Sequence, residues 1–160
     1  MRDLRALVIT VSDRVSKGEA DDRSGPAAAE RLAAMGFVCE HQIVPDGIYS
    51  VATVLREAVQ ADFALVVTTG GTGFTGRDLT PEATSSVIER PAPGLPEAMR
   101  AATFGVNPHG MLSRAVAGIA GQSLIVNLPG SVSGVTESLA AISEALPHAV
   151  ALIRSTPTEH

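Results

Sequence analysis

The hydrophobic positions along the chain predict buried strands separated by amphipathic helices. Residues 6–11 (ALVITV) and 63–68 (FALVVT) are apolar almost throughout, which is typical of strands buried on both faces of a parallel sheet. Residues 124–128 (LIVNL) form a third apolar run, and the mixed polarity of 37–44 is typical of a strand at the edge of a sheet. The pattern therefore predicts these four strands.

Helices are predicted between the strands from apolar residues spaced three and four apart and from residues that favour helix ends. Ser24, Gly25 and Pro26 favour a helix start, and Gly36 favours its end. The expected helices cover 24–35, 51–59, 80–89, 97–104 and 132–153, the last with a kink at Pro147. Residues 111–118 and 122–128 favour a hairpin with its turn at 119–121.

This alternation of strands and helices predicts an α/β fold. We expect one domain over residues 1–160, with a three-layer, doubly wound, mostly parallel sheet and helices on both faces. Ligands of such sheets bind beyond the carboxyl ends of the strands. The segments that follow the four strands contain carboxylates, hydroxyls and exposed backbone, which suit a phosphate ligand with a divalent cation. These segments are 12–14, 45–47, 69–73 and 129–131.

Composition excludes several other classes of protein. The net charge is −5, from 12 basic and 17 acidic residues, and aromatic residues make up 3%; a nucleic-acid surface needs a basic field and stacking platforms. Lys17 is the single lysine and does not follow a glycine loop, so there is no Walker-type phosphate loop. One cysteine, Cys39, excludes an intrachain disulfide and cysteine-rich metal sites. We expect a cytoplasmic protein with no signal sequence and no membrane span.

The glycine-rich segment 68–73 (TTGGTG) is the strongest local motif. Glycines allow several backbone N–H groups to point inward together and to hold phosphate oxygens, and the threonines add hydroxyl donors. The alternative is an ordinary turn at the end of a buried strand. Arg77, Asp78 and a helix start at 80–82 follow the loop, and because a helix N-terminus also favours anions, they support the phosphate interpretation.

Asp46 and Asp78 are the predicted metal ligands. Each lies just beyond a predicted strand, and Mg²⁺ takes one or two carboxylates and completes its shell with water and substrate phosphate oxygens. The alternative for Asp46 is an Asx turn before Gly47. Asp13 offers a third carboxylate at the same edge, or it pairs with Arg14.

Other polar residues carry weaker signals. The histidines at 41, 109, 148 and 160 have no partner in a metal-ligand pattern and are predicted to be structural or exposed. The chain has no Gly-x-Ser-x-Gly motif, so a hydrolase triad has little support. Residues 111–114 place Ser113 and Arg114 in the pocket, or they simply begin the hairpin; their sequence does not decide.

Six stretches in order resemble the Mog/MoaB family of molybdenum-cofactor biosynthesis proteins, including the gephyrin G domain. They cover most of the chain and are VSDR (11–14), VPDG (44–47), TTGGTG (68–73), RDLTPEAT (77–84), LSR (112–114) and NLPGS (127–131). The resemblance implies that ATP and molybdopterin react with Mg²⁺ to give adenylylated molybdopterin and pyrophosphate. It also implies that Asp46 and Asp78 are the essential aspartates.

Together, strand ends and resemblance define a set of substrate-binding residues. The set consists of Ser12, Asp13, Thr69, Gly70, Gly71, Thr72, Gly73, Arg77, Ser113, Asn127, Pro129, Gly130 and Ser131. The resemblance further implies a homotrimer and a downstream partner, the molybdenum-insertion protein. Two alternatives stay open: a family member that binds the pterin without adenylyl transfer, and a nucleotide or phosphate enzyme of the competence-damage-protein type.

Overall fold

The computed structural model describes residues 4–155 and has one six-stranded sheet in the order β2-β1-β3-β6-β5-β4. The strands are β1 (Arg5–Val11), β2 (Val38–Val44), β3 (Leu65–Thr69), β4 (Arg90–Pro91), β5 (Ala117–Ala120) and β6 (Ser123–Leu128). The helices are α1 (Asp13–Ser16), α2 (Ser24–Ala34), α3 (Ile48–Gln60), α4 (Thr80–Ser85), α5 (Gly94–Ala101), the 3-10 helix η1 (Pro108–Leu112), α6 (Val132–Ile142) and α7 (Ala145–Arg154).

The four predicted strands are neighbours and run parallel, as expected. Their registers align Val11 with Val44, Thr10 with Thr69, and Thr69 with Leu128. The carboxyl ends of β2, β1, β3 and β6 therefore finish at one edge of the sheet. The chain adds β2 on one side of β1 and β3 on the other, so the strand order reverses between β1 and β3, where doubly wound sheets bind ligands.

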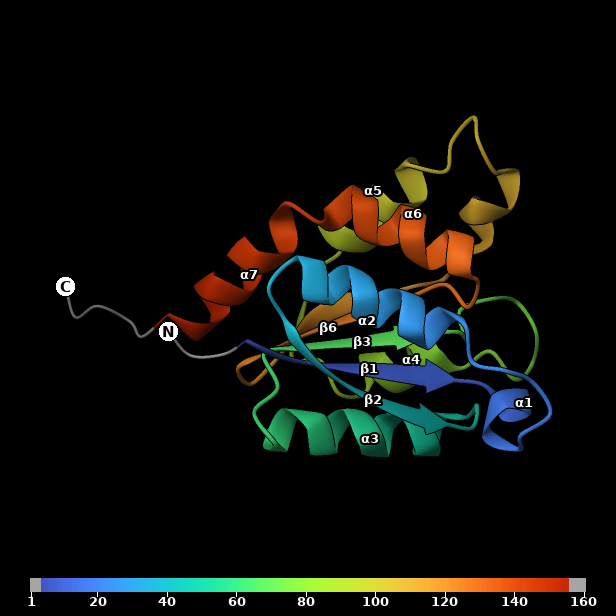
Figure 1. The fold of residues 1–160 in the computed structure, drawn as a ribbon, viewed down its shortest axis with the longest axis horizontal. Coiled ribbons are helices and arrows are strands. Elements are labelled where there is room, and N and C mark those ends of the chain that lie inside the picture. Colours follow the sequence, from blue (N-terminus) through green and yellow to red (C-terminus); the bar gives the residue numbers. More distant parts are fainter. Residues whose placement is uncertain (1–3, 156–160) are drawn as a thin grey trace.

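Helices cover both faces of the sheet, which confirms the predicted three layers (Figure 1). Successive strand residues point to opposite faces. Ala6 and Val8 join the apolar cluster beneath α2, α6 and α7, whereas Leu7 and Ile9 join the cluster that α3 covers. Continuous apolar strands are required because both faces are buried. No helix within residues 4–155 has the length and hydrophobicity to cross a membrane.

The prediction of one continuous helix over 132–153 is wrong. The segment forms two helices, α6 and α7, which residues 143–144 separate. Pro147 does not kink a helix. It lies in the first turn of α7, where a backbone N–H has no partner within the helix and its loss is harmless.

The middle of the chain differs most from the prediction. The helix expected over 80–89 stops at Ser85, and Arg90–Pro91 forms β4 at the sheet edge. The hairpin exists, but its turn lies at residues 121–122 instead of 119–121, and 111–116 lie outside the strand. Helix α1, which has four residues, was not predicted; the Ser12 hydroxyl caps it by accepting a hydrogen bond from the Val15 N–H at 3.2 Å.

Candidate active site

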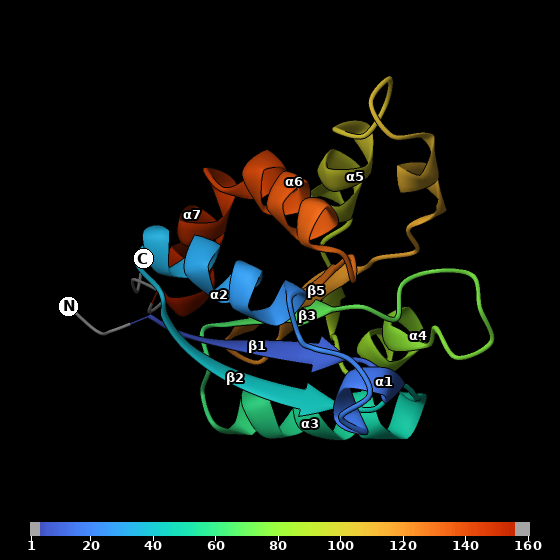
Figure 2. The ribbon, with the colours of Figure 1, turned by 45° about the vertical axis from the view of Figure 1, so that its right-hand side comes forward.

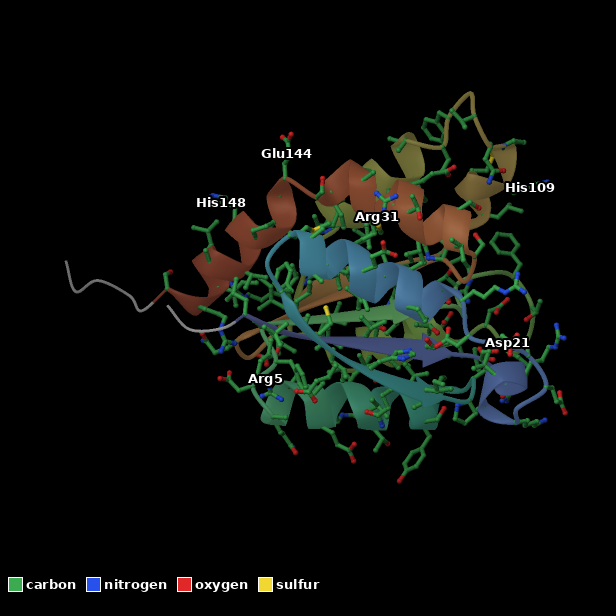
Figure 3. All side chains as sticks on the ribbon, viewed as in Figure 1. Arg5, Asp21, Arg31, His109, Glu144 and His148 are labelled. Carbon is green, nitrogen blue, oxygen red and sulfur yellow. The ribbon has the colours of Figure 1, made fainter. Side chains whose placement is uncertain are left out.

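Two adjacent cavities lie at the edge where the parallel strands end. Figure 2 shows β1 and β2 ending at this edge, beside α1. One, the Asp46 cavity, has a volume of about 550 Å³ and is lined by Ser12, Asp46 and Thr69 together with the residues that begin α2. The other, the Ser113 cavity, has a volume of about 430 Å³ and extends below α5, η1 and α6. In Figure 3, Asp21 and His109, which line one cavity each, lie at this end of the molecule, and Arg5 lies at the other.

Most of the predicted site residues meet around these cavities. The Ser113 cavity is lined by Thr72, Gly73, Ser113 and Pro129. Both cavities are bounded by five common residues, which we call the shared rim: Gly70, Gly71, Asp78, Gly130 and Ser131. Because the rim belongs to both cavities, two ligands bound side by side would meet there.

The glycine loop needs its glycines for two separate reasons. Gly70 and Gly71 have φ values of +91° and +70°, a conformation that side chains disfavour. A Cβ on Gly70 would also lie 2.4 Å from the Val11 carbonyl oxygen, and one on Gly71 would lie 2.2 Å from the Thr80 hydroxyl. Thr80 fixes the loop, because its hydroxyl donates to the Gly70 carbonyl at 3.0 Å and its N–H donates to the Gly71 carbonyl at 3.1 Å.

Asp46 is held by a reciprocal pair of hydrogen bonds with Asp13. The Asp13 N–H donates to Asp46 Oδ2 at 2.9 Å, and the Asp46 N–H donates to Asp13 Oδ1 at 3.2 Å. The other carboxylate oxygen, Oδ1, faces the glycine loop, 3.1 Å from where a Cβ on Gly71 would stand. Burial raises the pKa of Asp46, and the nearby charges of Asp13 and Asp78 also raise it, against the lowering by the Asp13 N–H.

Asp78 approaches the same space from the loop that follows β3. Its Oδ2 accepts a hydrogen bond from the Thr75 N–H at 2.9 Å and lies 2.8 Å from where a Cβ on Gly73 would stand. Asp46 and Asp78 both line the Asp46 cavity. Two carboxylates of like charge beside a glycine-rich loop fit a hard cation that binds oxygen ligands.

A cation here would need further ligands from a substrate. Within residues 4–155, no group of three histidine, cysteine, aspartate or glutamate side chains is placed to hold a metal. Mg²⁺ commonly binds through one or two carboxylates and completes its shell with phosphate oxygens and water. The residues present therefore fit a Mg²⁺ ion that binds together with a phosphate-bearing substrate.

Arg77, predicted as a substrate contact, instead pairs with Asp13. Its Nε and Nη2 donate to the two carboxylate oxygens of Asp13 at 3.0 Å each, and Nη2 also donates to the Asp46 carbonyl at 2.8 Å. The hydrogen bond from Arg77 lowers the pKa of Asp13. Neither residue is part of the cavity linings, and Asp13 pairs with Arg77 rather than with Arg14. Their observed contacts hold Asp46 in place.

Asn127, also predicted as a substrate contact, is fully buried and tied to protein groups. Its Nδ2 donates to the hydroxyls of Thr68 and Thr84 at 3.0 and 2.9 Å, and its Oδ1 accepts from the Val116 N–H at 3.2 Å. These bonds join β6 to β3, to α4 and to the segment before β5. The side chain therefore braces the wall behind the cavities.

Substituting Asn127 by alanine is expected to lower the free energy of unfolding by about 2–3 kcal/mol, because the half-buried Val116 N–H and the buried hydroxyls of Thr68 and Thr84 lose their partner. Urea unfolding followed by circular dichroism measures this. Asn107→Ala is the matched control, since Asn107 is exposed and its side chain accepts one hydrogen bond, from the His109 N–H. Equal stability of the two variants would contradict the bracing role.

Several residues at the site were not predicted. Asp22 lines the Asp46 cavity and caps α2, since its Oδ1 accepts from the Gly25 N–H at 3.0 Å. His41 Nε2 lies 2.9 Å from both Asp22 Oδ2 and the Thr10 hydroxyl, which agrees with the structural role predicted for it. An Asp three residues before a glycine in a helix start is a capping signal, but nothing in the sequence links it to His41.

One of the two alternatives for residues 111–114 placed Ser113 and Arg114 in the pocket, and Glu82 was not predicted at the site. Ser113 lines the Ser113 cavity as one alternative expected, whereas Arg114 lies outside both linings. The Arg114 guanidinium forms an ion pair with Glu82 in the first turn of α4. No spacing in the sequence predicts this pair, because 32 positions separate the two residues.

Known proteins resemble this chain over nearly its whole length. The family described as a probable molybdopterin binding domain matches residues 7–148. A molybdopterin adenylyltransferase of Helicobacter pylori is 38% identical, over 96% of this chain and 89% of the relative. Gephyrin of Dictyostelium discoideum is 41% identical over 94% of this chain, which spans 22% of the length of gephyrin.

Solved structures agree with these matches. The molybdopterin biosynthesis enzyme MoaB from Thermus thermophilus has a TM-score of 0.90 at 42% identity, with 98% of this chain and 99% of that chain covered. CinA from Thermoplasma acidophilum, with a TM-score of 0.68 at 19% identity, shares the fold alone. With a family match over residues 7–148 and close relatives of similar length, this chain belongs to the Mog/MoaB family of molybdenum-cofactor biosynthesis proteins.

Proposed function

We propose that the chain transfers the adenylyl group of ATP to molybdopterin. The observation that carries the proposal is the shared rim, where the Asp46 cavity and the Ser113 cavity meet beside two carboxylates and a glycine loop. Relatives of similar length are named molybdopterin adenylyltransferases. One cavity for each substrate would bring their phosphates together at the rim.

The reaction needs two phosphates to approach each other. An oxygen of the terminal phosphate of molybdopterin attacks the α-phosphorus of ATP, a new P–O bond forms, and the bond to pyrophosphate breaks. Both reactants are anionic, so repulsion between them is the main obstacle. No general base is required, because a phosphate monoester is already ionised near neutral pH.

The residues at the shared rim and beside it lower this obstacle in three ways. Asp46 and Asp78 would hold Mg²⁺, which when bound supplies positive charge to the phosphates and to the departing pyrophosphate. The backbone N–H groups of residues 71–73 offer neutral donors to phosphate oxygens, whereas the Gly70 N–H donates to the Leu128 carbonyl at 3.1 Å. Asp13, fixed by Arg77, keeps Asp46 in position through its N–H. Preorganised groups of this kind need no rearrangement as the charge develops.

A direct assay tests the proposal. The purified chain is incubated with molybdopterin, ATP and Mg²⁺, and mass spectrometry follows adenylylated molybdopterin while a coupled assay follows pyrophosphate. We expect both products in equal amounts, and neither when ATP is omitted or Mg²⁺ is chelated. Pterin binding with no product would instead favour a binding protein. ATP turnover without molybdopterin would favour a nucleotide enzyme of another type.

We also propose a homotrimer in the cytoplasm that passes its product to the protein that inserts molybdenum. Exposed apolar side chains support self-association, since Phe104, Val106 and Met111 are 66%, 74% and 60% exposed on one segment beside the Ser113 cavity. Sedimentation equilibrium is expected to give about three times the chain mass of 16.4 kDa. A mass equal to one chain at micromolar concentration would contradict the assembly.

A further inference from the structure

Arg114 joins the two ends of the loop that carries Asp78. Its Nε donates to the Gly73 carbonyl at 2.8 Å, and its Nη2 donates to the Asp78 carbonyl at 2.6 Å. Its backbone N–H donates to the Thr72 carbonyl at 2.9 Å. One residue, distant in sequence, therefore fixes the beginning and the end of residues 73–78.

Between these ends the loop is held by Arg77, whose side chain pairs with Asp13, and by the Asp78 N–H, which donates to the Thr75 carbonyl at 3.1 Å. Residues 74–77 are exposed, so burial does not hold them. The Asp78 carboxylate folds back inside the loop and accepts the Thr75 N–H at 2.9 Å. We infer that the direction of that carboxylate also depends on the separation of the loop ends, which the Arg114 guanidinium spans.

Glu82 keeps Arg114 from acting as a substrate ligand. The guanidinium pairs with the Glu82 carboxylate through Nη1 and Nη2, with Nη2 to Oε2 at 3.4 Å as the longer contact. The hydrogen bond from Arg114 lowers the pKa of Glu82, so the carboxylate stays charged. Because its charge is compensated and it lies outside both cavity linings, Arg114 is not placed to bind phosphate.

We propose that Arg114 is a positioning residue for adenylyl transfer, which holds residues 73–78 so that the Asp78 carboxylate keeps its place in the shared rim. This inference rests on the proposed function. The same contact explains why Ser113 and Asp78 line one cavity. Arg114 follows Ser113 in the chain, and its guanidinium binds the Asp78 carbonyl. Arg100 fixes the same segment from the other side by donating to the carbonyls of Ser113 and Ala115 at 3.2 and 3.0 Å.

Arg114→Lys tests the proposal with little change in charge. A lysine ammonium can still pair with Glu82, but it is a single point donor and cannot span two carbonyls as the guanidinium fork does. We expect hydrogen exchange of the Thr75 amide to become roughly 10-fold faster, which corresponds to one weakened hydrogen bond. We expect kcat to fall roughly 10- to 100-fold and the KM for molybdopterin to change less than about 3-fold, because positioning acts on the transition state.

Arg154→Lys is the matched control. Arg154 also joins a carbonyl to a carboxylate, donating to Gln122 O at 3.1 Å and Asp62 Oδ2 at 2.8 Å, but it lies at the end of the sheet opposite the site. Loss of stability alone would speed amide exchange across the chain in both variants. The proposal requires faster exchange at Thr75 in Arg114→Lys and not in Arg154→Lys. If Arg114→Lys does not fold, Arg114→Gln, which retains one donor group, is measured in its place.

The outcomes separate this proposal from the proposed function. The positioning role would be overturned if the Thr75 amide of the Arg114 variant exchanged at the wild-type rate. It would also be overturned if the variant changed KM and left kcat unchanged. If the wild-type chain forms no adenylylated molybdopterin, the proposed function fails. The exchange measurement, which needs no substrate, then still decides whether Arg114 sets the position of Asp78.

Discussion

Replacing Asp78 by asparagine is expected to lower the rate of adenylylated molybdopterin formation by on the order of 10²–10³, which is typical when one transition-state stabiliser is removed. The amide keeps the size of the side chain and still accepts the Thr75 N–H, but it loses the charge that would hold Mg²⁺. Asp46→Asn is expected to behave alike, because both carboxylates line the same cavity. Single-turnover kinetics at saturating ATP and Mg²⁺ measure the effect.

Measuring the affinity of these variants for molybdopterin distinguishes an effect on the reaction rate from an effect on substrate binding. We expect it to change far less than the rate, because the neutral backbone donors of the glycine loop stay in place for the phosphate of molybdopterin. The double variant is expected to lose much less than the sum of the two single losses, since both residues would act through one ion. Glu30→Gln, an exposed carboxylate on α2, is the control and should keep full activity. Full activity in either aspartate variant would exclude that residue from the mechanism.

Gly70→Ala is expected to destabilise the fold by about 2–5 kcal/mol, which lowers the melting temperature by roughly 5–20 °C for a chain of this length. The left-handed backbone at φ +91° contributes about 1–2 kcal/mol. The remainder comes from the new Cβ, which would stand 2.4 Å from the Val11 carbonyl oxygen at the end of β1. Differential scanning calorimetry measures the change.

Gly36→Ala isolates the backbone contribution. Gly36 has φ +97°, close to that of Gly70, but its position has no heavy atom within 4 Å of an added Cβ. We expect it to lose about 1–2 kcal/mol, so the difference between the two variants reports the steric clash. If both variants melt at the same temperature, then the approach of Val11 to Gly70 is less tight than the structure shows.

The sheet was predictable because burial on both faces demands long apolar runs, and β1, β3 and β6 have them. The direction of these strands then placed Asp46, Asp78 and the glycine loop at one edge. Element ends in the middle of the chain were less predictable. Arg90–Pro91 pairs with β5 at the sheet edge, and that pairing depends on tertiary contacts that no local pattern of residues encodes.

The partners of charged side chains were the least predictable part of the site. Asp13 is adjacent to Arg14 in sequence but binds Arg77, 64 positions away. The motif that contains Asn127 predicted a substrate contact, whereas its amide satisfies hydroxyls of two other elements. Sequence motifs identify residues that must not change, and they do not distinguish a residue that contacts a ligand from one that supports the residues that do.

The shared rim makes the two cavities thermodynamically dependent on each other. A ligand in one cavity forms part of the wall of the other, through the five residues that both include. Linkage then requires that each ligand change the affinity of the other by the same factor. Two phosphate groups meeting at the rim would weaken one another's binding, and a divalent cation between them would reverse the sign of that coupling.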